Sequence, residues 1–212
     1  MPNDESSTLL HQVQARGEGA LTEVFLRYRE RLKRMVHLRM DRRLQGRVDA
    51  SDVLQEAYLD VAQRGAEYLA NPTMPLFLWL RWLTGERLLA IHRKHLGAQK
   101  RDVGREISLH RGAMPQATSA SLAAQLLGHL TSPTQAVVRA ELQIKLQEVL
   151  NSMDPVDREV LVLRHFEELS NNETAEVLGI HKAAASNRYK RALKRLRGLL
   201  TEIPGLLDQA AT

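Results

Sequence analysis

Positive charge is concentrated near the C-terminal end of the chain, in a segment that contains no acid. Residues 177–201 include no Asp or Glu, whereas they hold Lys182, Arg188, Lys190, Arg191, Lys194, Arg195 and Arg197. Lysine and arginine side chains crowded on one helix are typical of a surface that neutralises the phosphates of a nucleic acid. A solvated helix face is the alternative interpretation of the same residues.

Capping and turn residues around the start of this basic segment predict two helices joined by a tight turn. Ser170 and Glu173 have the spacing of a capping box, in which each side chain satisfies a backbone N–H of the other residue. A short helix must therefore start there. Gly179 is expected to end it in a turn that requires positive φ, with small Ala175 allowing close helix approach. With Ile180 filling the turn and a helix from 182 to about 200, the pattern predicts a helix-turn-helix.

In a DNA-binding helix-turn-helix, the second helix enters the major groove with its early turns near the base edges. Asn187 is suited to read adenine and Arg191 guanine, and Arg188 with Lys190 is suited to bind phosphate. Ala185 and Tyr189 are expected to pack inward, and an ion pair with an acid such as Glu176 is the alternative for Arg188. The candidate DNA contacts are Lys182, Ala184, Ser186, Asn187, Arg188, Lys190 and Arg191.

Composition restricts the fold class and the chemistry. The 212 residues are 43% hydrophobic but only 4% aromatic, and Leu, Ala and Arg recur throughout, which favours helices over strands. Without cysteine there is no disulfide, thiolate zinc site or cysteine nucleophile. His92 and His95 are too few for a metal site, and no glycine-rich phosphate loop or nucleophile motif is present. We therefore expect neither an enzyme nor a cofactor.

The N-terminal residues are polar and acidic, and no apolar run approaches the length of a membrane span. We expect a cytoplasmic protein without membrane contact. Its net charge of +5 hides further basic segments at 27–47 and 91–105.

Helical periodicity and breaker residues divide the chain into two small helical domains, an all-α fold. The first domain, 1–103, should hold helices at 9–15, at 20–40, from Asp49 or Ser51 to about Gly65, and from Pro75 to about Leu96. Small polar residues then predict a flexible linker at 104–131, with a short helix around 122–127. The second domain, 132–203, should hold helices at 133–150 and 155–166 before the helix-turn-helix, and 204–212 form a tail.

Both domains carry motifs that resemble one known family. Residues 146–200, with Asp157-Arg158-Glu159-Val160, Leu178-Gly179-Ile180 and Asn187-Arg188-Tyr189, resemble sigma region 4. The first half resembles sigma region 2, with Asp52-Val53-Leu54-Gln55-Glu56-Ala57-Tyr58-Leu59 followed by Phe77, Trp79-Leu80 and a basic helix. Since a linker replaces the intervening region, the chain resembles the extracytoplasmic-function (ECF) class of bacterial sigma factors.

The resemblance implies how region 2 works. Asp52, Gln55 and Glu56 share one helix face and would bind core RNA polymerase, although a plain solvated face is the alternative. Trp79 is expected in the core, whereas Trp82 can either stack on exposed bases or pack inward. The DNA contacts implied for this domain are Arg81, Trp82, Arg87, His92, Arg93 and Lys94.

The function implied is that of a sigma factor, which binds core RNA polymerase and directs promoter recognition and transcription initiation. Promoter DNA and the polymerase are the expected partners, with an anti-sigma factor as a further candidate. The alternative is a stand-alone helix-turn-helix transcriptional regulator, but its first domain should contain strands, which the helical pattern of this chain disfavours.

Overall fold

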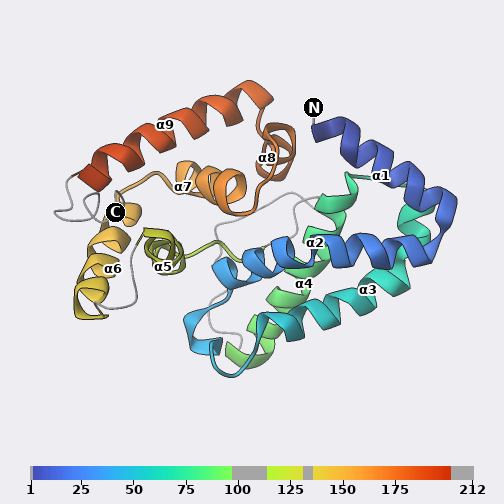
Figure 1. Cartoon of the computed structure of the whole chain (residues 1–212), viewed down its shortest axis with the longest axis horizontal. Helices are drawn as coiled ribbons and strands as arrows, with labels where there is room; N and C mark the ends of the chain where they lie inside the picture. The colour runs from blue at the N-terminus through green and yellow to red at the C-terminus, as the bar shows by residue number, and fades with distance from the viewer. Residues whose placement is uncertain (1, 97–113, 131–135, 202–212) are drawn as a thin grey trace. The chain divides into compact units, whose positions relative to one another are not determined.

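A computed structural model describes residues 2–96, 114–130 and 136–201, and these ranges contain helices and no strand (Figure 1). The expected all-helical fold is confirmed. The chain divides into two compact units, Met1–Pro115 and Gln116–Thr212, each with its own packed helices.

Five helical elements make up the described part of the first unit. They are α1 (Pro2–Arg16), α2 (Glu18–Arg39), the short 3₁₀ turn η1 (Arg42–Leu44), α3 (Ala50–Ala70) and α4 (Leu76–Leu96). α2, α3 and α4 pack against one another. Their shared core includes Leu32, Met35, Leu80, Leu83 and Leu88, all at most 1% exposed.

Aromatic packing fixes the α3–α4 turn. The Tyr68 ring stacks on Trp79 with 4.3 Å between centroids, and the Tyr68 hydroxyl donates to the Met74 carbonyl at 2.7 Å. Trp79 is 4% exposed, so its expected place in the core is confirmed.

Helix α3 starts as the sequence predicts but ends later. Asp49 is the N-cap, and a capping box joins it to Asp52, whose carboxylate accepts the Asp49 N–H at 3.0 Å. Gly65 was expected near the end of this helix, and that prediction is wrong, because the helix continues to Ala70. A Cβ at Gly65 would lie 2.6 Å from Leu21 Cδ1, so glycine serves the close approach of α2 and α3 and does not stop α3.

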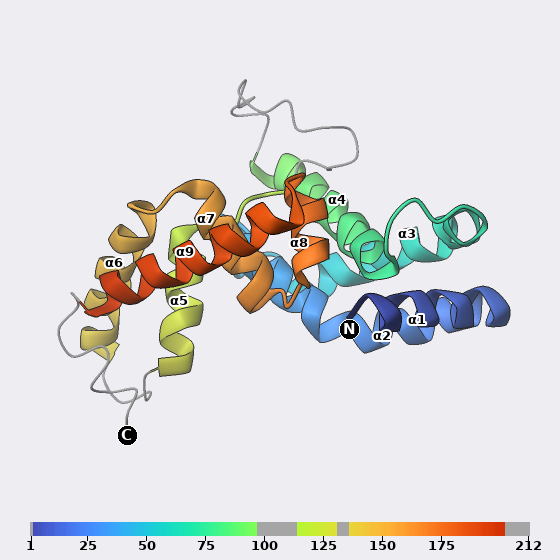
Figure 2. The same ribbon diagram turned by 90° about the horizontal axis from the view of Figure 1, so that it is seen from above.

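The described part of the second unit consists of α5 (Ser119–Leu130), α6 (Ala136–Asn151), α7 (Pro155–Leu161), the π turn η2 (Val162–Phe166), α8 (Asn171–Leu178) and α9 (Lys182–Thr201). α5 lies beside α6, and α9 packs on α7 and α8 (Figure 2). Asp154 caps α7 by accepting the N–H groups of Val156 and Asp157, and Pro155 occupies the first turn.

The segment expected to be a linker is partly structured. Residues 119–130 form α5, a longer helix than the short one expected at 122–127, and Leu122, Ala123 and Leu127 are buried. Small and apolar residues at helical spacing give α5 a face that packs on α6, so this part of the chain belongs to the second unit. Residues 104–113 and 131 lie outside the described ranges.

Candidate nucleic-acid interface

The helix-turn-helix consists of α8, a three-residue turn and α9. Ser170 and Glu173 form the expected capping box at the start of α8. Gly179 ends α8 in the left-handed conformation, with φ 57° and ψ 43°, and the Ile180 N–H donates to the Ala175 carbonyl at 3.0 Å. The Asn171 side chain also donates to the Lys182 carbonyl at 2.9 Å, which ties the first turn of α8 to the first turn of α9.

Small residues hold α9 close to its neighbours. Ala185 and Ala192 are fully buried, and Tyr189 is half-buried with the Arg164 guanidinium 5.1 Å from its ring centroid. Ala185 and Tyr189 therefore face inward, as the sequence predicts. The opposite side of α9 is left open to solvent.

The open side of α9 carries the candidate DNA contacts. Lys182, Asn187, Lys190 and Arg191 are exposed, and Ala184, Ser186 and Arg188 are half-buried. Lys194, Arg195 and Arg197, which belong to the basic segment predicted from the sequence, are exposed as well and continue the surface along α9. We call the exposed cations of α9 without an ion pair to any described residue the basic fringe, which comprises Lys182, Lys190, Lys194, Arg195 and Arg197.

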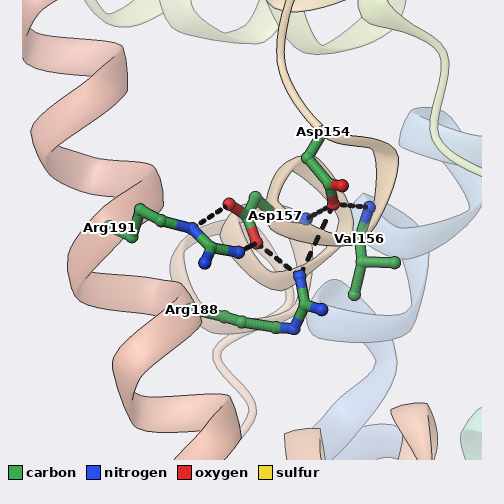
Figure 3. Close-up of polar contacts among 5 residues, drawn as sticks. All are labelled: Asp154, Val156, Asp157, Arg188 and Arg191. Atoms are coloured by element: carbon green, nitrogen blue, oxygen red, sulfur yellow. Dashed lines mark hydrogen bonds and ion pairs between the residues drawn. The ribbon is translucent and has the colours of Figure 1, made fainter.

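Two arginines of α9 converge on a single carboxylate of α7 (Figure 3). Arg191 donates from Nε to Asp157 Oδ2 at 2.6 Å and from Nη2 to Oδ1 at 2.7 Å, while Arg188 Nη1 donates to the same Oδ1 at 2.8 Å. These hydrogen bonds, with the Arg191 bonds the largest cause, hold the pKa of Asp157 below its ordinary value despite burial. An ion pair of Arg188 was expected as an alternative, but its partners are Asp157 and Asp154, and Glu176 lies exposed.

In the first unit, some of the residues predicted to contact DNA are exposed, whereas others are buried or bound to neighbouring side chains and backbone groups. Arg93 and Lys94 are exposed near the end of α4, and Trp82 is half-buried with the Arg64 guanidinium 4.5 Å from its ring centroid. Arg81 is only 6% exposed, so it lies within the unit and not on an open surface.

Two more of these residues are engaged inside the unit. Arg87 of α4 forms a two-pronged ion pair with buried Asp60 of α3, and this contact raises the pKa of Arg87. His92 accepts the backbone N–H of Asp41 at Nε2, 3.3 Å away, and burial lowers the pKa of His92. The sequence could not show these contacts, because their partners lie far away along the chain.

The surface predicted to bind polymerase lies on α3. Asp52, Gln55 and Glu56 are exposed on one face of this helix, and Asp52 also serves in the capping box. Leu59 extends the face as an apolar side chain with 60% of its surface exposed. The sequence reasoning missed Leu59, although its spacing from Gln55 and Glu56 places it on the same face.

No group of three or more His, Asp or Glu side chains suited to a metal ion occurs within the described ranges. In the same ranges, none of the helices has both the length and the apolar character to cross a bilayer.

Comparison with known proteins agrees with this geometry. Residues 143–196 match the family of sigma-70, region 4. The chain is 44% identical over 52 residues to RNA polymerase sigma-E factor of Streptomyces coelicolor, a match that covers 24% of this chain and 29% of the relative. RNA polymerase sigma factor NccH of Alcaligenes xylosoxydans xylosoxydans is 36% identical over 78 residues, or 36% of this chain and 41% of the relative. The matches thus span well under half of these relatives.

A solved structure is similar over nearly the whole chain. It is that of CnrH in complex with the cytosolic domain of CnrY, with 18% sequence identity and a TM-score of 0.50 over 92% of this chain and 96% of that one. The stretch that matches sigma-70, region 4 contains the basic helix-turn-helix of the second unit. The relatives that match parts of this chain are sigma factors, and the similar solved structure has the same fold.

Proposed function

We propose that this protein binds core RNA polymerase and directs it to promoters to initiate transcription. The observation that carries the proposal is the α8–α9 helix-turn-helix, whose second helix is basic and free of acids and lies in the stretch that matches sigma-70 region 4. The same function places the protein in the cytoplasm with DNA and polymerase, as a non-catalytic factor.

The second unit supplies the upstream promoter contact in this proposal. The early turns of α9 enter the major groove, where Asn187 and Arg191 reach base edges. Phosphate contacts from Lys182, Lys190 and the rest of the basic fringe fix the position of the helix on the duplex. The open side of α9 and the firm packing of Ala185 and Ala192 beneath it support these roles.

The first unit supplies the polymerase contact and the contact to the opened promoter. Asp52, Gln55, Glu56 and Leu59 form one exposed face of α3, and an apolar side chain among polar ones suits a protein partner. On α4, Arg93 and Lys94 bind the DNA backbone.

Trp82 is the candidate for base stacking in the first unit, since part of its ring surface stays accessible beside Arg64. Buried Arg81 and the engaged Arg87 and His92 act on DNA only through the shape of α4 in this proposal.

A protein antagonist is a further proposed partner. The similar structure is that of CnrH bound to the cytosolic domain of CnrY, so a protein of this fold does form such a complex. Anti-sigma control of this chain is a proposal by analogy with that complex.

In vitro transcription from a genomic promoter library tests the function. Purified bacterial core polymerase is assayed with and without the full chain, and transcript starts are sequenced. We expect new starts that share a two-part upstream motif. A Gln55→Ala/Glu56→Arg variant serves as the control for core binding, and it should lose the new starts while it still binds duplex DNA.

The alternative function gives a different result. A stand-alone regulator would bind specific duplexes but form no complex with core polymerase and produce no new starts. That combination of results would overturn the sigma-factor proposal.

A further inference from the structure

The carboxylate of Asp157 is buried, and its surroundings stabilise its negative charge in place of water. It occupies the first turn of α7, where the helix dipole favours negative charge, and it is 6% exposed. Both of its carboxylate oxygens accept hydrogen bonds from α9: Oδ1 from Arg188 and Arg191, and Oδ2 from Arg191 (Figure 3). One buried acid therefore binds two arginines that are both candidates for DNA contact.

The hydrogen bonds to Asp157 use only one edge of the Arg191 guanidinium. Nε and Nη2 bind the carboxylate, while Nη1 has no partner within the described residues, and 61% of the Arg191 side chain is exposed. A guanidinium is planar and carries five N–H donors, so an acid on one edge fixes the plane of the group. The edge formed by Nη1 and Nη2 then points away from Asp157.

An arginine whose orientation is fixed differs from a mobile one in what it can recognise. Guanine presents O6 and N7 side by side in the major groove, and a guanidinium edge binds both only in a defined orientation. A mobile arginine instead binds any phosphate within reach, which adds affinity without sequence preference. By fixing the orientation of Arg191, Asp157 thus favours a contact with a base edge over a contact with phosphate.

We propose that Asp157 is a positioning residue that determines sequence specificity, because it holds Arg191 in the orientation for a base-edge contact and keeps Arg188 beside it. Asp157 itself touches no DNA. The inference rests on the proposed function, in which α9 enters the major groove.

The experiment compares specificity with affinity for the full chain. Duplexes are selected from a random library by the wild-type protein, and the enriched duplex and a scrambled duplex are then titrated by fluorescence anisotropy across a salt series. The variants are Asp157→Asn, Arg191→Ala and both together. Glu141→Gln is the matched control, since it removes one exposed carboxylate from α6 and leaves α9 unchanged.

Asp157→Asn should lower the ratio of specific to scrambled affinity about tenfold, within the range that one bidentate base contact contributes. Scrambled binding should hold or rise, because a negative charge is lost and Arg191 becomes available to phosphates. Repeating the selection with this variant should show the preference lost at one base pair. The double variant should be no less specific than Arg191→Ala alone, because both changes remove the same contact. Glu141→Gln should leave the ratio unchanged.

Other outcomes overturn the inference. Equal loss of affinity for both duplexes, with a lower melting temperature, would assign Asp157 a purely structural role. A rise in specific affinity would make it an inhibitory clamp. If Asp157→Asn does not fold, Asp157→Glu keeps the charge while displacing Arg191 by one methylene, and an unchanged ratio in that variant also overturns the inference.

A wild-type chain that enriches no sequence overturns the inference as well. The transcription assay decides the proposed function separately, so the two failures are distinguishable.

Discussion

Charged side chains meet differently where α3 packs on α4 and where α7 packs on α9. Across α3 and α4 they are matched one to one, with Arg87 on Asp60 and Arg64 on Glu86. Across α7 and α9, Asp157 receives both Arg188 and Arg191, and the basic fringe has no acid opposite it among the described residues. The first arrangement joins two helices, whereas the second leaves positive charge available to a ligand.

The contrast shows that the facing helix decides what a cation does. The sequence makes both α4 and α9 basic helices, yet Arg87 of α4 is held in an ion pair by a buried acid of α3. Among the candidate cations of α4, Arg93 and Lys94 remain exposed at its end. We therefore expect duplex DNA affinity to depend mainly on α9.

The largest effect is expected from reversing charge on the basic fringe. Lys190→Glu/Lys194→Glu should lower affinity for the enriched duplex more than about 100-fold at 0.1 M salt, since each phosphate contact contributes roughly tenfold there. Neither lysine has a partner among the described residues, so the fold should be unaffected. Fluorescence anisotropy measures the loss, and circular dichroism checks the fold.

The matched comparison is Arg93→Glu/Lys94→Glu on α4, which makes the same change of net charge. It should lower duplex affinity less than about tenfold and mainly reduce promoter opening, which permanganate footprinting of the polymerase complex detects. Equal losses of duplex affinity in the α4 and α9 double variants would mean that net charge alone governs binding. Duplex affinity would then not depend mainly on α9.

Breaking the Asp60–Arg87 ion pair between α3 and α4 should make a cation of α4 available to DNA, as the cations of the basic fringe on α9 are. Asp60→Asn keeps the shape of the side chain but leaves Arg87 without its main countercharge, at a cost of about 1–2 kcal/mol because Asp60 is buried and Arg87 is partly exposed. Thermal unfolding should shift down by several degrees, and scrambled-duplex affinity should rise as Arg87 becomes available. Glu86→Gln, an exposed site, is the control, and a shift of the same size there would contradict the prediction.

The contrast also marks how far sequence reasoning reaches. The capping boxes at Asp49 and Ser170 and the turn at Gly179 could be predicted, because each depends on residues within a few positions. The Asp60–Arg87 and Asp157–Arg191 pairs join residues 27 and 34 positions apart, so helix packing has to be known first. Gly65 was misread for the same reason, since its role depends on Leu21 of a neighbouring helix.

A smaller effect is expected at the turn before α8. Glu168 has φ 57°, a left-handed conformation that a side chain with a Cβ disfavours. Glu168→Gly should therefore be about 1 kcal/mol more stable than Glu168→Ala in chemical unfolding of the second unit, because both lose the side chain but only glycine relieves the strain. An alanine variant as stable as the glycine variant would show that the turn is not strained.

The smallest effect concerns His92, which the sequence assigned to DNA and the structure assigns to the Asp41 backbone N–H. Burial, the largest cause, and Arg43 lower the pKa of His92 below 6.5, while Asp41 opposes the shift. Between the two pKa values the unfolded chain binds more protons, so the stability of the first unit should rise with pH there and fall as pH drops below 6.5.

Urea unfolding at several pH values between 7 and 5 measures this change in stability. His92→Gln can still accept the Asp41 N–H through its amide oxygen but does not titrate, so it should remove this part of the pH dependence. If His92 bound phosphate instead, the same substitution would weaken DNA binding most at low pH, where the imidazole is charged. The alternative result is that the DNA affinities of the wild type and His92→Gln differ by the same amount at every pH from 7 to 5. Together with the altered stability profile, this result would assign His92 a structural role within its unit.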